Sequence, residues 1–541
     1  MPANNTISWK RLCWEFNIES TVFAHRFIAN RQLTRFERVW WAVWLGVSFI
    51  SCWFLALTTY HKWCENPVVI VYAPQLSPVS TIPFPAITIC PLTKTRVEAF
   101  NLTEVFEMVK NKSVLDEYRE RQLRVMAHVC PFSRYWKNFS VDPNEAVVET
   151  LQNMSLSFAK TIALCAWRNK LEICNHLFTE TLVDDGFCYT FNELLPNETY
   201  RLSEISEDFT SFATSAIPSR WTLDGGYDKQ AGLNAFPHRA LASGIKSGLI
   251  FIPVMRKIDQ EFLCRGPYTG YKFAVHTPGE IPLTGDKFYR LNTLNALILM
   301  VTPRVVNTGN HLISLSPSRR RCFFNDERQL RFFKRYTESN CLMECISNYT
   351  LYKCQCVKFS MPRTARMKVC DASKIDCYHK VYQDMYNTKV SNSMAGNPES
   401  RCNCLPACNS LEYDVEISQF PFHFHELAAA LEIPTIDYKR VDPAVMIVGF
   451  KDRHYLPMWR RELMGITDAV AKMGGFFALL VGASMLSLGE LVYYSCIRPL
   501  RRERPVAGAP HHAPIYRTTK SSKTDLYLSA PNRLRFFASA S

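Results

Sequence analysis

The sequence predicts a membrane protein with two transmembrane helices and a large, disulfide-rich α+β domain between them. Two long apolar runs lie near the ends of the 541-residue chain, and 17 of its 20 cysteines lie between these runs. Cysteines in such numbers are typical of an oxidising, extracellular compartment. Because the chain enters and leaves that compartment through two membrane segments, we expect both termini in the cytosol.

The first apolar run, residues 39–59, contains 21 uncharged residues. As a helix it is long enough to cross a bilayer core of ~30 Å. Arg31, Arg35 and Arg38 stand directly before it, which places the polar tail of residues 1–38 in the cytosol. The tail has no apolar stretch of its own, so we expect no cleavable signal peptide.

The second run, Met473–Ile497, lies in a predicted transmembrane helix of residues 469–497. A straight helix of that run would span about 37 Å. Gly475, Gly482 and Gly489 recur at heptad spacing, and small residues allow helices to approach closely in lipid. Glu490 is an ionisable group within the same run, which is costly in a membrane. Two interpretations stay open at this point: a packing seam with Glu490 reaching the headgroups, or a helix that lines a pore.

The net charge of +14 is concentrated in the two tails. Residues 497–541 carry nine lysines and arginines against two acidic residues, and residues 1–38 carry six against three. Basic ends beside membrane segments follow the positive-inside rule, so the lipid bilayer is the expected partner and nucleic acid is not. We expect the basic tail of residues 498–541 to be disordered and the protein to reside in the plasma membrane.

Residues 60–468 form the predicted extracellular domain, and no comparable apolar run interrupts them. Residues 67–72 and 445–450 read as strands that enter and leave near the membrane, and residues 326–346 read as a helix. Six N-x-S/T sequons mark candidate glycosylation sites at Asn101, Asn111, Asn138, Asn153, Asn197 and Asn348.

The cysteine spacing is the most specific pattern in this domain. Cys341, Cys345, Cys354 and Cys356 are mirrored by Cys402, Cys404 and Cys408 further along, with gaps of four and two on one side and two and four on the other. Zinc ligation is the rival interpretation, but the compartment favours disulfides. Spacing alone does not give the connectivity.

No catalytic motif is present, so we expect neither an enzyme nor a cofactor or metal site. His425-Glu426 is not a zinc-protease motif, because Ala429 stands where that motif needs its second histidine.

Several stretches together resemble the degenerin/epithelial sodium channel family, and they cover residues from about 20 to 498 in that family's order. They are IPFPAITIC (82–90), GFCYTFN (186–192), HTPGEIP (276–282), the YTxxNCxxEC pattern (336–345), CNCLPAC (402–408) and GASMLSLGE (482–490). The extra cysteines and the wording of the first stretch resemble insect pickpocket-type members.

The resemblance implies a trimeric, amiloride-sensitive sodium channel whose ectodomain has palm, β-ball, finger, thumb and knuckle parts. Its implied partners are sodium ions and related subunits, in a homo- or heterotrimer. The residues that it implies for the pore are a selectivity constriction at Gly482, Ala483 and Ser484, pore-lining positions at Gly475, Ala478 and Glu490, with Ala478 at the amiloride contact, and a gating position at Ala471.

The resemblance also implies seven disulfides: Cys90–Cys188, Cys165–Cys174, Cys322–Cys408, Cys341–Cys404, Cys345–Cys402, Cys354–Cys377 and Cys356–Cys370. Cys64, Cys130 and Cys264 remain, and pairing Cys130 with Cys264 would leave Cys64 over.

One departure concerns gating. Family members carry a His-Gly pair after a Ser-Thr-x text before the first membrane helix, whereas this chain has Phe23 and Ala24. The chain is therefore expected to be weakly active alone or to act in a mixed trimer. The alternative from another class is a cysteine-rich adhesion or ligand-binding receptor without a pore.

Overall fold

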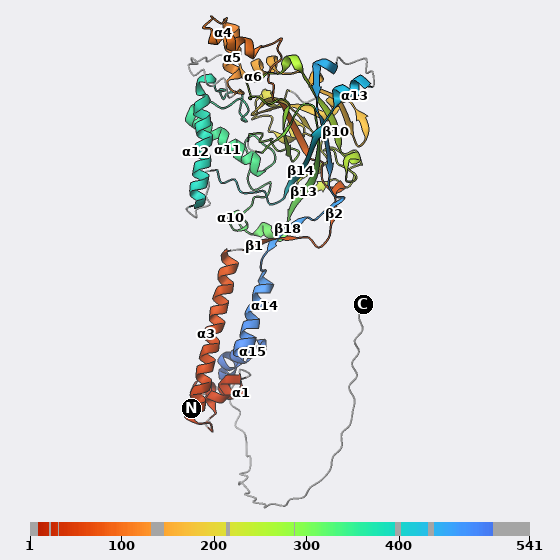
Figure 1. Cartoon of the computed structure of the whole chain (residues 1–541). Coiled ribbons are helices and arrows are strands. Elements are labelled where there is room, and N and C mark those ends of the chain that lie inside the picture. Colours follow the sequence, from red (N-terminus) through yellow and green to blue (C-terminus); the bar gives the residue numbers. More distant parts are fainter. Residues whose placement is uncertain are drawn as a thin grey trace, which may run out of the picture. The chain divides into compact units, whose positions relative to one another are not determined.

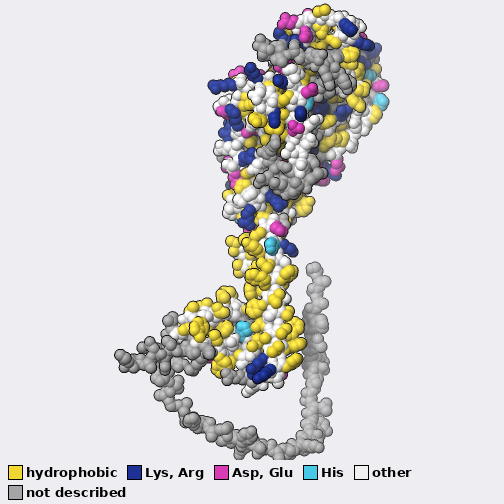
Figure 2. All heavy atoms as spheres, turned by 90° about the vertical axis from the view of Figure 1, so that its left-hand side faces the viewer, with side chains coloured by type: hydrophobic (Ala, Val, Ile, Leu, Met, Phe, Trp, Pro, Cys, Tyr) yellow, Lys and Arg dark blue, Asp and Glu magenta, His cyan; other side chains and the backbone are white. Residues whose placement is uncertain are grey.

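A computed structural model describes residues 9–20, 23–30, 32–65, 67–130, 145–211, 217–285, 287–394, 402–430 and 438–500. The chain divides into two compact units. We call Met1–Thr59 with Ala469–Ser541 the helical unit, and Tyr60–Asp468 the sheet unit. Hydrophobic side chains cover most of the visible surface of the helical unit, whereas charged side chains of both signs are interspersed over the sheet unit (Figure 2). The predicted tail beyond residue 500 lies outside the described residues.

The helical unit is built on α3, Arg35–Glu65, which extends the predicted span of residues 39–59 at both ends. Among the described residues it is the one unbroken helix long and apolar enough to cross a membrane. Two short helices precede it, and the second apolar run forms a bent pair of segments. The bounds are α1 Trp9–Glu19, α2 Phe23–Ala29, α14 Ile466–Phe476, α15 Met485–Val492 and α16 Arg498–Leu500, with π-helical turns at Phe477–Val481 and Tyr493–Ile497.

A nine-stranded sheet runs through the sheet unit in the order β1-β18-β13-β16-β10-β4-β5, with β14 paired to β13 and β15 paired to β10. The long strand β13 is paired along one edge with β14 and along the other with β16 and β18, and β13 and β14 run beside each other in Figure 1. Their bounds are β1 Val68–Tyr72, β4 Ile162–Trp167, β5 Lys170–Glu172, β10 Leu249–Arg256, β13 Asn295–Thr308, β14 Ser410–Pro421, β15 Val441–Pro443, β16 Val445–Phe450 and β18 Met458–Glu462.

A five-stranded antiparallel sheet, β12-β11-β3-β7-β6, packs against the larger one through a shared core. Phe84 shows the packing, since its ring contacts Trp167 and Phe450 of the larger sheet and Phe191 of the smaller one. These strands are β3 Ala86–Pro91, β6 Phe178–Val183, β7 Gly186–Phe191, β11 Tyr271–His276 and β12 Tyr289–Leu291. Two short ladders pair β2 Ser77–Pro78 with β17 His454–Tyr455, and β8 Trp221–Thr222 with β9 Gly226–Tyr227.

Helices flank the sheets of this unit. The helices α11 and α12 lie side by side, and α4, α5 and α6 gather at one end of the unit around a hydrophobic cluster of their own (Figure 1). The bounds are α4 Leu102–Lys110, α5 Glu117–Met126, α6 Val147–Met154, α7 Phe158–Thr161, α8 Cys174–Leu177, α9 Pro196–Thr199, α10 Pro317–Arg320, α11 Glu338–Cys354, α12 Ile375–Met394 and α13 Phe424–Ala430. Short 3-10 turns link several of the elements.

Both predicted strands, at residues 67–72 and 445–450, are present, but the second lies at a different place in the sheet from the one expected. β1 and β16 occupy residues 68–72 and 445–450, which confirms both as strands. The partner of β1 is β18, however, and β16 lies inside the sheet between β13 and β10. The expectation that residues 445–450 leave the domain beside the membrane is therefore wrong. The leaving strand is β18, whose MWRRE sequence lacks the apolar run typical of a strand.

The predicted helix of residues 326–346 is also wrong in its first half. The helix α11 begins only at Glu338, where the Thr337 side chain caps it by accepting a hydrogen bond from the backbone of Asn340. Leu330 and Phe333 are buried in a hydrophobic cluster, and Phe333 forms an isolated bridge with Tyr200. Tertiary packing therefore overrides the helical spacing in this segment.

Eight disulfides are present: Cys90–Cys188, Cys130–Cys264, Cys165–Cys174, Cys322–Cys408, Cys341–Cys404, Cys345–Cys402, Cys354–Cys377 and Cys356–Cys370. These are the seven pairs that the resemblance implies, together with Cys130–Cys264. Cys64 is free and exposed. Because the cysteines of the mirrored pattern are all bound in disulfides, their sulfurs are not available as zinc ligands.

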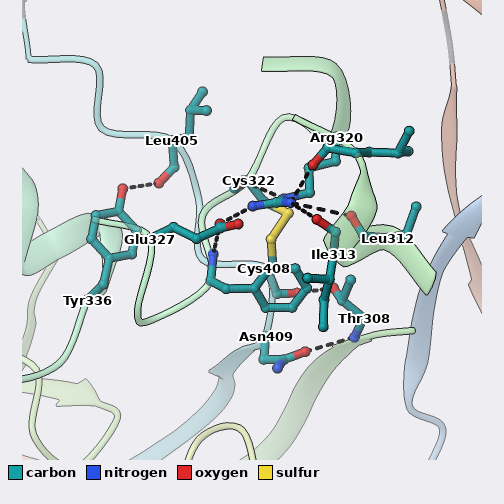
Figure 3. The surroundings of a disulfide bond; sticks show 12 residues. Thr308, Leu312, Ile313, Arg320, Cys322, Glu327, Tyr336, Leu405, Cys408 and Asn409 are labelled. Carbon is teal, nitrogen blue, oxygen red and sulfur yellow. Dashed lines mark hydrogen bonds and ion pairs between the residues drawn. A yellow bond between two sulfur atoms is a disulfide. The ribbon is translucent and has the colours of Figure 1, made fainter. Parts of the chain in front are cut away.

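A buried arginine organises the backbone around Cys322–Cys408 (Figure 3). The Arg320 side chain is 1% exposed, and its guanidinium donates to the carbonyls of Leu312, Leu315 and Cys322 and pairs with Glu327. Thr308 continues the network by donating its hydroxyl to the Cys408 carbonyl at 2.5 Å. Sequence reasoning missed Arg320, because an arginine at the end of a four-residue helix gives no sign in the sequence that it is buried.

Most of the sequon asparagines that the structure describes are exposed. Asn111, Asn153, Asn197 and Asn348 are exposed. Asn101 is half-buried and caps α4 by accepting a hydrogen bond from the Glu104 backbone at 3.3 Å. Asn138 lies outside the described residues.

Candidate pore segment

The second apolar run is broken at Gly482, Ala483 and Ser484. The segments on either side, Ile466–Val481 and Met485–Ile497, are bent by 81° relative to each other. Gly482 has a φ of +70°, a left-handed conformation that favours glycine. Its N–H donates to the Ala478 carbonyl at 3.2 Å, and the N–H of Ala483 donates to that of Phe477 at 3.2 Å. The glycine therefore ends the first segment as a C-cap.

Ser484 starts the second segment. Its side chain accepts a hydrogen bond from the Ser487 backbone N–H at 3.4 Å, while the Ser487 hydroxyl accepts one from the Ser484 N–H at 3.1 Å. This reciprocal pair is a capping box, which satisfies two donors that a helix start leaves open. The break is thus encoded by a helix stop and a helix start in adjacent residues.

The break packs against α3 within the helical unit. Cys52 of α3 and Val481 are buried against each other, with Leu45, Phe476 and Ala483 around them. Gly482 and Ser484 are exposed, and nothing lies within 4 Å of a side-chain carbon placed on Gly482. One side of the break is therefore fixed to α3, and the other is open.

The remaining predicted pore residues lie on both segments. Ala471, Gly475 and Ala478 are exposed on the first, and Glu490 is half-buried on the second. The heptad spacing of Gly475, Gly482 and Gly489 predicts that they lie on nearly one face of a continuous helix, and this expectation is wrong, because the helix does not continue through the bend. Phe23 and Ala24 open α2, and their side chains are not among those described.

Sequence reasoning missed a contact between α1 and the end of the second segment. Arg498 donates to the Glu15 carboxylate at 3.0 Å, and the Tyr494 hydroxyl donates to Glu19. The Phe16 ring meets Tyr494 edge-on, with centroids 5.7 Å apart. The hydrogen-bonded residues are 475 and 483 positions apart, and no local pattern in either stretch indicates the contacts.

Comparison with known proteins identifies the family. A family model described as "Amiloride-sensitive sodium channel" matches residues 16–494, nearly the whole chain. The chain belongs to this family. The degenerin/epithelial sodium channel resemblance seen in the motifs is thereby confirmed.

Curated relatives agree with this membership. The chain is 24% identical to Pickpocket protein 28 of Drosophila melanogaster over 492 residues, covering 89% of this chain and 77% of that protein. It is 23% identical to Sodium channel protein Nach of Drosophila ananassae, covering 90% and 87% respectively. It is 22% identical to the human Bile acid-sensitive ion channel, covering 91% and 87%. The similarity to pickpocket proteins matches the expectation from the cysteines and from residues 82–90.

Proposed function

We propose that this chain is a subunit of a trimeric, sodium-selective and amiloride-sensitive channel in the plasma membrane, which passes Na⁺ down its gradient when an extracellular stimulus opens it. The coarser part of this statement follows from membership, since the family consists of ion channels and its members form multimers. Selectivity, block and gating belong to the proposal.

The observation that supports it most is the interrupted helix at Gly482, Ala483 and Ser484. In lipid, unpaired backbone groups cost several kcal/mol each, so non-helical backbone at membrane depth is tolerated only inside protein or beside water. A helix used only as an anchor has no need for such a break. Ala483 packs on α3, whereas Gly482 and Ser484 stay open in the single chain, as residues that line a central path would be.

The mechanism rests on oxygen atoms at this break. Three copies would present the last carbonyls of the first segment together with the Ser484 hydroxyls. These oxygens replace part of the hydration shell of Na⁺. Glu490 of each copy would add a negative ring on the cytosolic side that concentrates cations. Passive flux of this kind requires no catalytic group and no cofactor.

Phe23 and Ala24 stand where family members carry the His-Gly pair, and this difference affects the current that we expect. We propose that the chain passes little current alone and works beside related subunits, since the His-Gly pair that assists opening in the family is replaced.

Selectivity tests the proposed constriction. Ser484→Cys, recorded in a background carrying Ala471→Phe, is expected to admit K⁺ or to abolish current while the protein still reaches the surface. Cysteine is larger than serine and is a weaker N-cap, so the substitution removes about 1 kcal/mol of capping and shifts the constriction geometry. The measurement is the reversal potential in mixed Na⁺ and K⁺ solutions.

Ser495→Cys is the matched control, because Ser495 is exposed and lies eleven residues beyond Ser484. It should leave the reversal potential unchanged. A Ser484→Cys channel with the reversal potential of its background would show that the constriction is elsewhere.

A further inference from the structure

The sheet unit contains a cavity of about 580 Å³ that the proposed pore does not use. Its walls come from the loop after β11, the start of α11, the β8–β9 hairpin and the start of β14. A volume of that size is typical of sites for small molecules. The HTPGEIP stretch, residues 276–282, forms one wall of the cavity. The sequence alone did not predict this location for the motif.

The walls are fixed in place by buried hydrogen bonds. Asn340, fully buried at the start of α11, donates to the Gly279 carbonyl at 3.4 Å and accepts from the Ile281 backbone at 3.2 Å. The Thr277 hydroxyl donates to the Leu411 carbonyl of β14. The loop is therefore tied to two neighbouring elements, and a ligand would meet a preorganised surface.

Acidic groups outnumber basic ones around this cavity. Its lining includes the carboxylates of Asp224, Glu280, Glu338 and Glu412, against the cations of Lys287 and Arg335. Burial lowers the pKa of His276 to about 4, so its ring is neutral near pH 7. The cavity thus has a negative balance.

Glu280 is half-buried in the wall of the cavity. Burial raises its pKa to about 7, and the charges of Glu412 and Glu338 act in the same direction. Hydrogen bonding by the Thr277 backbone and the Thr337 side chain acts on this pKa in the opposite direction, and no ion pair between residues that the structure describes includes Glu280. A desolvated carboxylate with neighbouring negative charges gains most from a cation placed beside it.

Aromatic side chains complete the lining. Trp221, Phe323, Tyr336 and Tyr413 contribute to the walls, and all four residues are less than 10% exposed. Arg335 and Arg328 already lie over the rings of Trp221 and Phe323, so these walls offer a ligand apolar ring edges, against which its apolar group can be buried. A metal ion fits the site less well, because no three acidic, histidine or cysteine side chains in the described ranges are arranged to ligate one.

We propose that this cavity binds a small organic cation, an amine or guanidinium compound with an attached apolar group. Its charged end would lie beside Glu280 and its apolar end against the aromatic walls. The binding claim does not depend on ion conduction, so it stands or falls separately from the proposed function.

The test uses benzamidine, which joins an amidinium to an aromatic ring, and benzamide as its neutral analogue of similar shape. Binding to the purified full-length chain in detergent is measured by titration calorimetry. We expect benzamidine to bind with a dissociation constant below about 1 mM and benzamide to bind at least tenfold more weakly. Absence of benzamidine binding, or equal affinity for the two compounds, would overturn the proposal.

Variants locate the site. Glu280→Gln keeps the shape of the side chain and should weaken benzamidine at least tenfold, and Glu412→Gln should weaken it about threefold. Glu172→Gln is the control, because Glu172 is exposed on β5 and does not line the cavity. Thermal unfolding shows whether each variant is folded. If Glu280→Gln does not fold, the affinity of Glu412→Gln for benzamidine tests the site instead. Undiminished binding to a folded Glu280→Gln or Glu412→Gln protein would place benzamidine elsewhere and refute the site.

Discussion

Ala471→Phe is expected to produce a constitutive sodium current at least tenfold larger than that of the unmodified chain. Ala471 is exposed on α14, eleven residues before the break, where three copies would approach one another in a shut pore. A phenylalanine there overpacks the shut state, at a typical cost of ~1–3 kcal/mol per site. Three sites together can supply the ~5.5 kcal/mol that inverts a 1:99 population.

The measurement is whole-cell current in sodium solution, with surface biotinylation of the same cells. Val470→Phe is the matched control: it adds the same ring one residue earlier, about 100° around the helix. It should leave the current near that of the parent. An Ala471→Phe protein that reaches the surface and is silent, alone and beside a related subunit, would contradict the gating assignment.

Cys345→Ser is expected to abolish delivery to the cell surface. Cys345 and Cys341 lie one turn apart on α11 and pair with Cys402 and Cys404, so the two bridges form adjacent rungs of a ladder. Removing one native disulfide typically costs ~2–5 kcal/mol, a large part of the 5–15 kcal/mol that holds a domain folded. The loss acts on folding in the secretory pathway and not on gating.

Surface labelling and glycan maturation report this outcome. Cys64→Ser is the control, because Cys64 is the exposed free thiol of the same unit, and its loss removes no bridge. It should mature normally. Normal maturation of Cys345→Ser would show that the ladder is dispensable for folding.

The sequence could predict the parts of this structure that local chemistry determines. The 21 uncharged residues of the first run can form little other than a spanning helix, and α3 contains all of them. The mirrored cysteine spacing also has a local cause: α11 presents Cys341 and Cys345 at helical spacing, and the partner segment presents Cys402 and Cys404 at alternate positions. The pairing itself came from the family resemblance.

The break in the second run carried a local signal that hydropathy concealed. Gly482 is a typical helix stop, and the serines at 484 and 487 have the spacing of a capping box. Glycine and serine lower the mean hydropathy of such an apolar run only slightly, so a hydropathy window does not reveal the break. An inspection of capping patterns inside apolar runs would have found the break.

Other features depend on distant partners and leave no such signal. The strand β18 pairs with β1 across almost 400 residues, and its charged sequence resembles a loop. Arg320 is buried because the backbone carbonyls on either side of α10 and the Glu327 carboxylate surround it. The contact of α1 with Tyr494 and Arg498 likewise exists only in the folded helical unit.

The reversal potential of the Ala471→Phe current shows whether this chain forms the sodium-selective path that we propose. When external Na⁺ is replaced by K⁺, we expect the reversal potential to shift strongly negative, with loss of inward current. A reversal potential that does not move, or surface-expressed protein without current in either solution, would show that the chain forms no sodium-selective path.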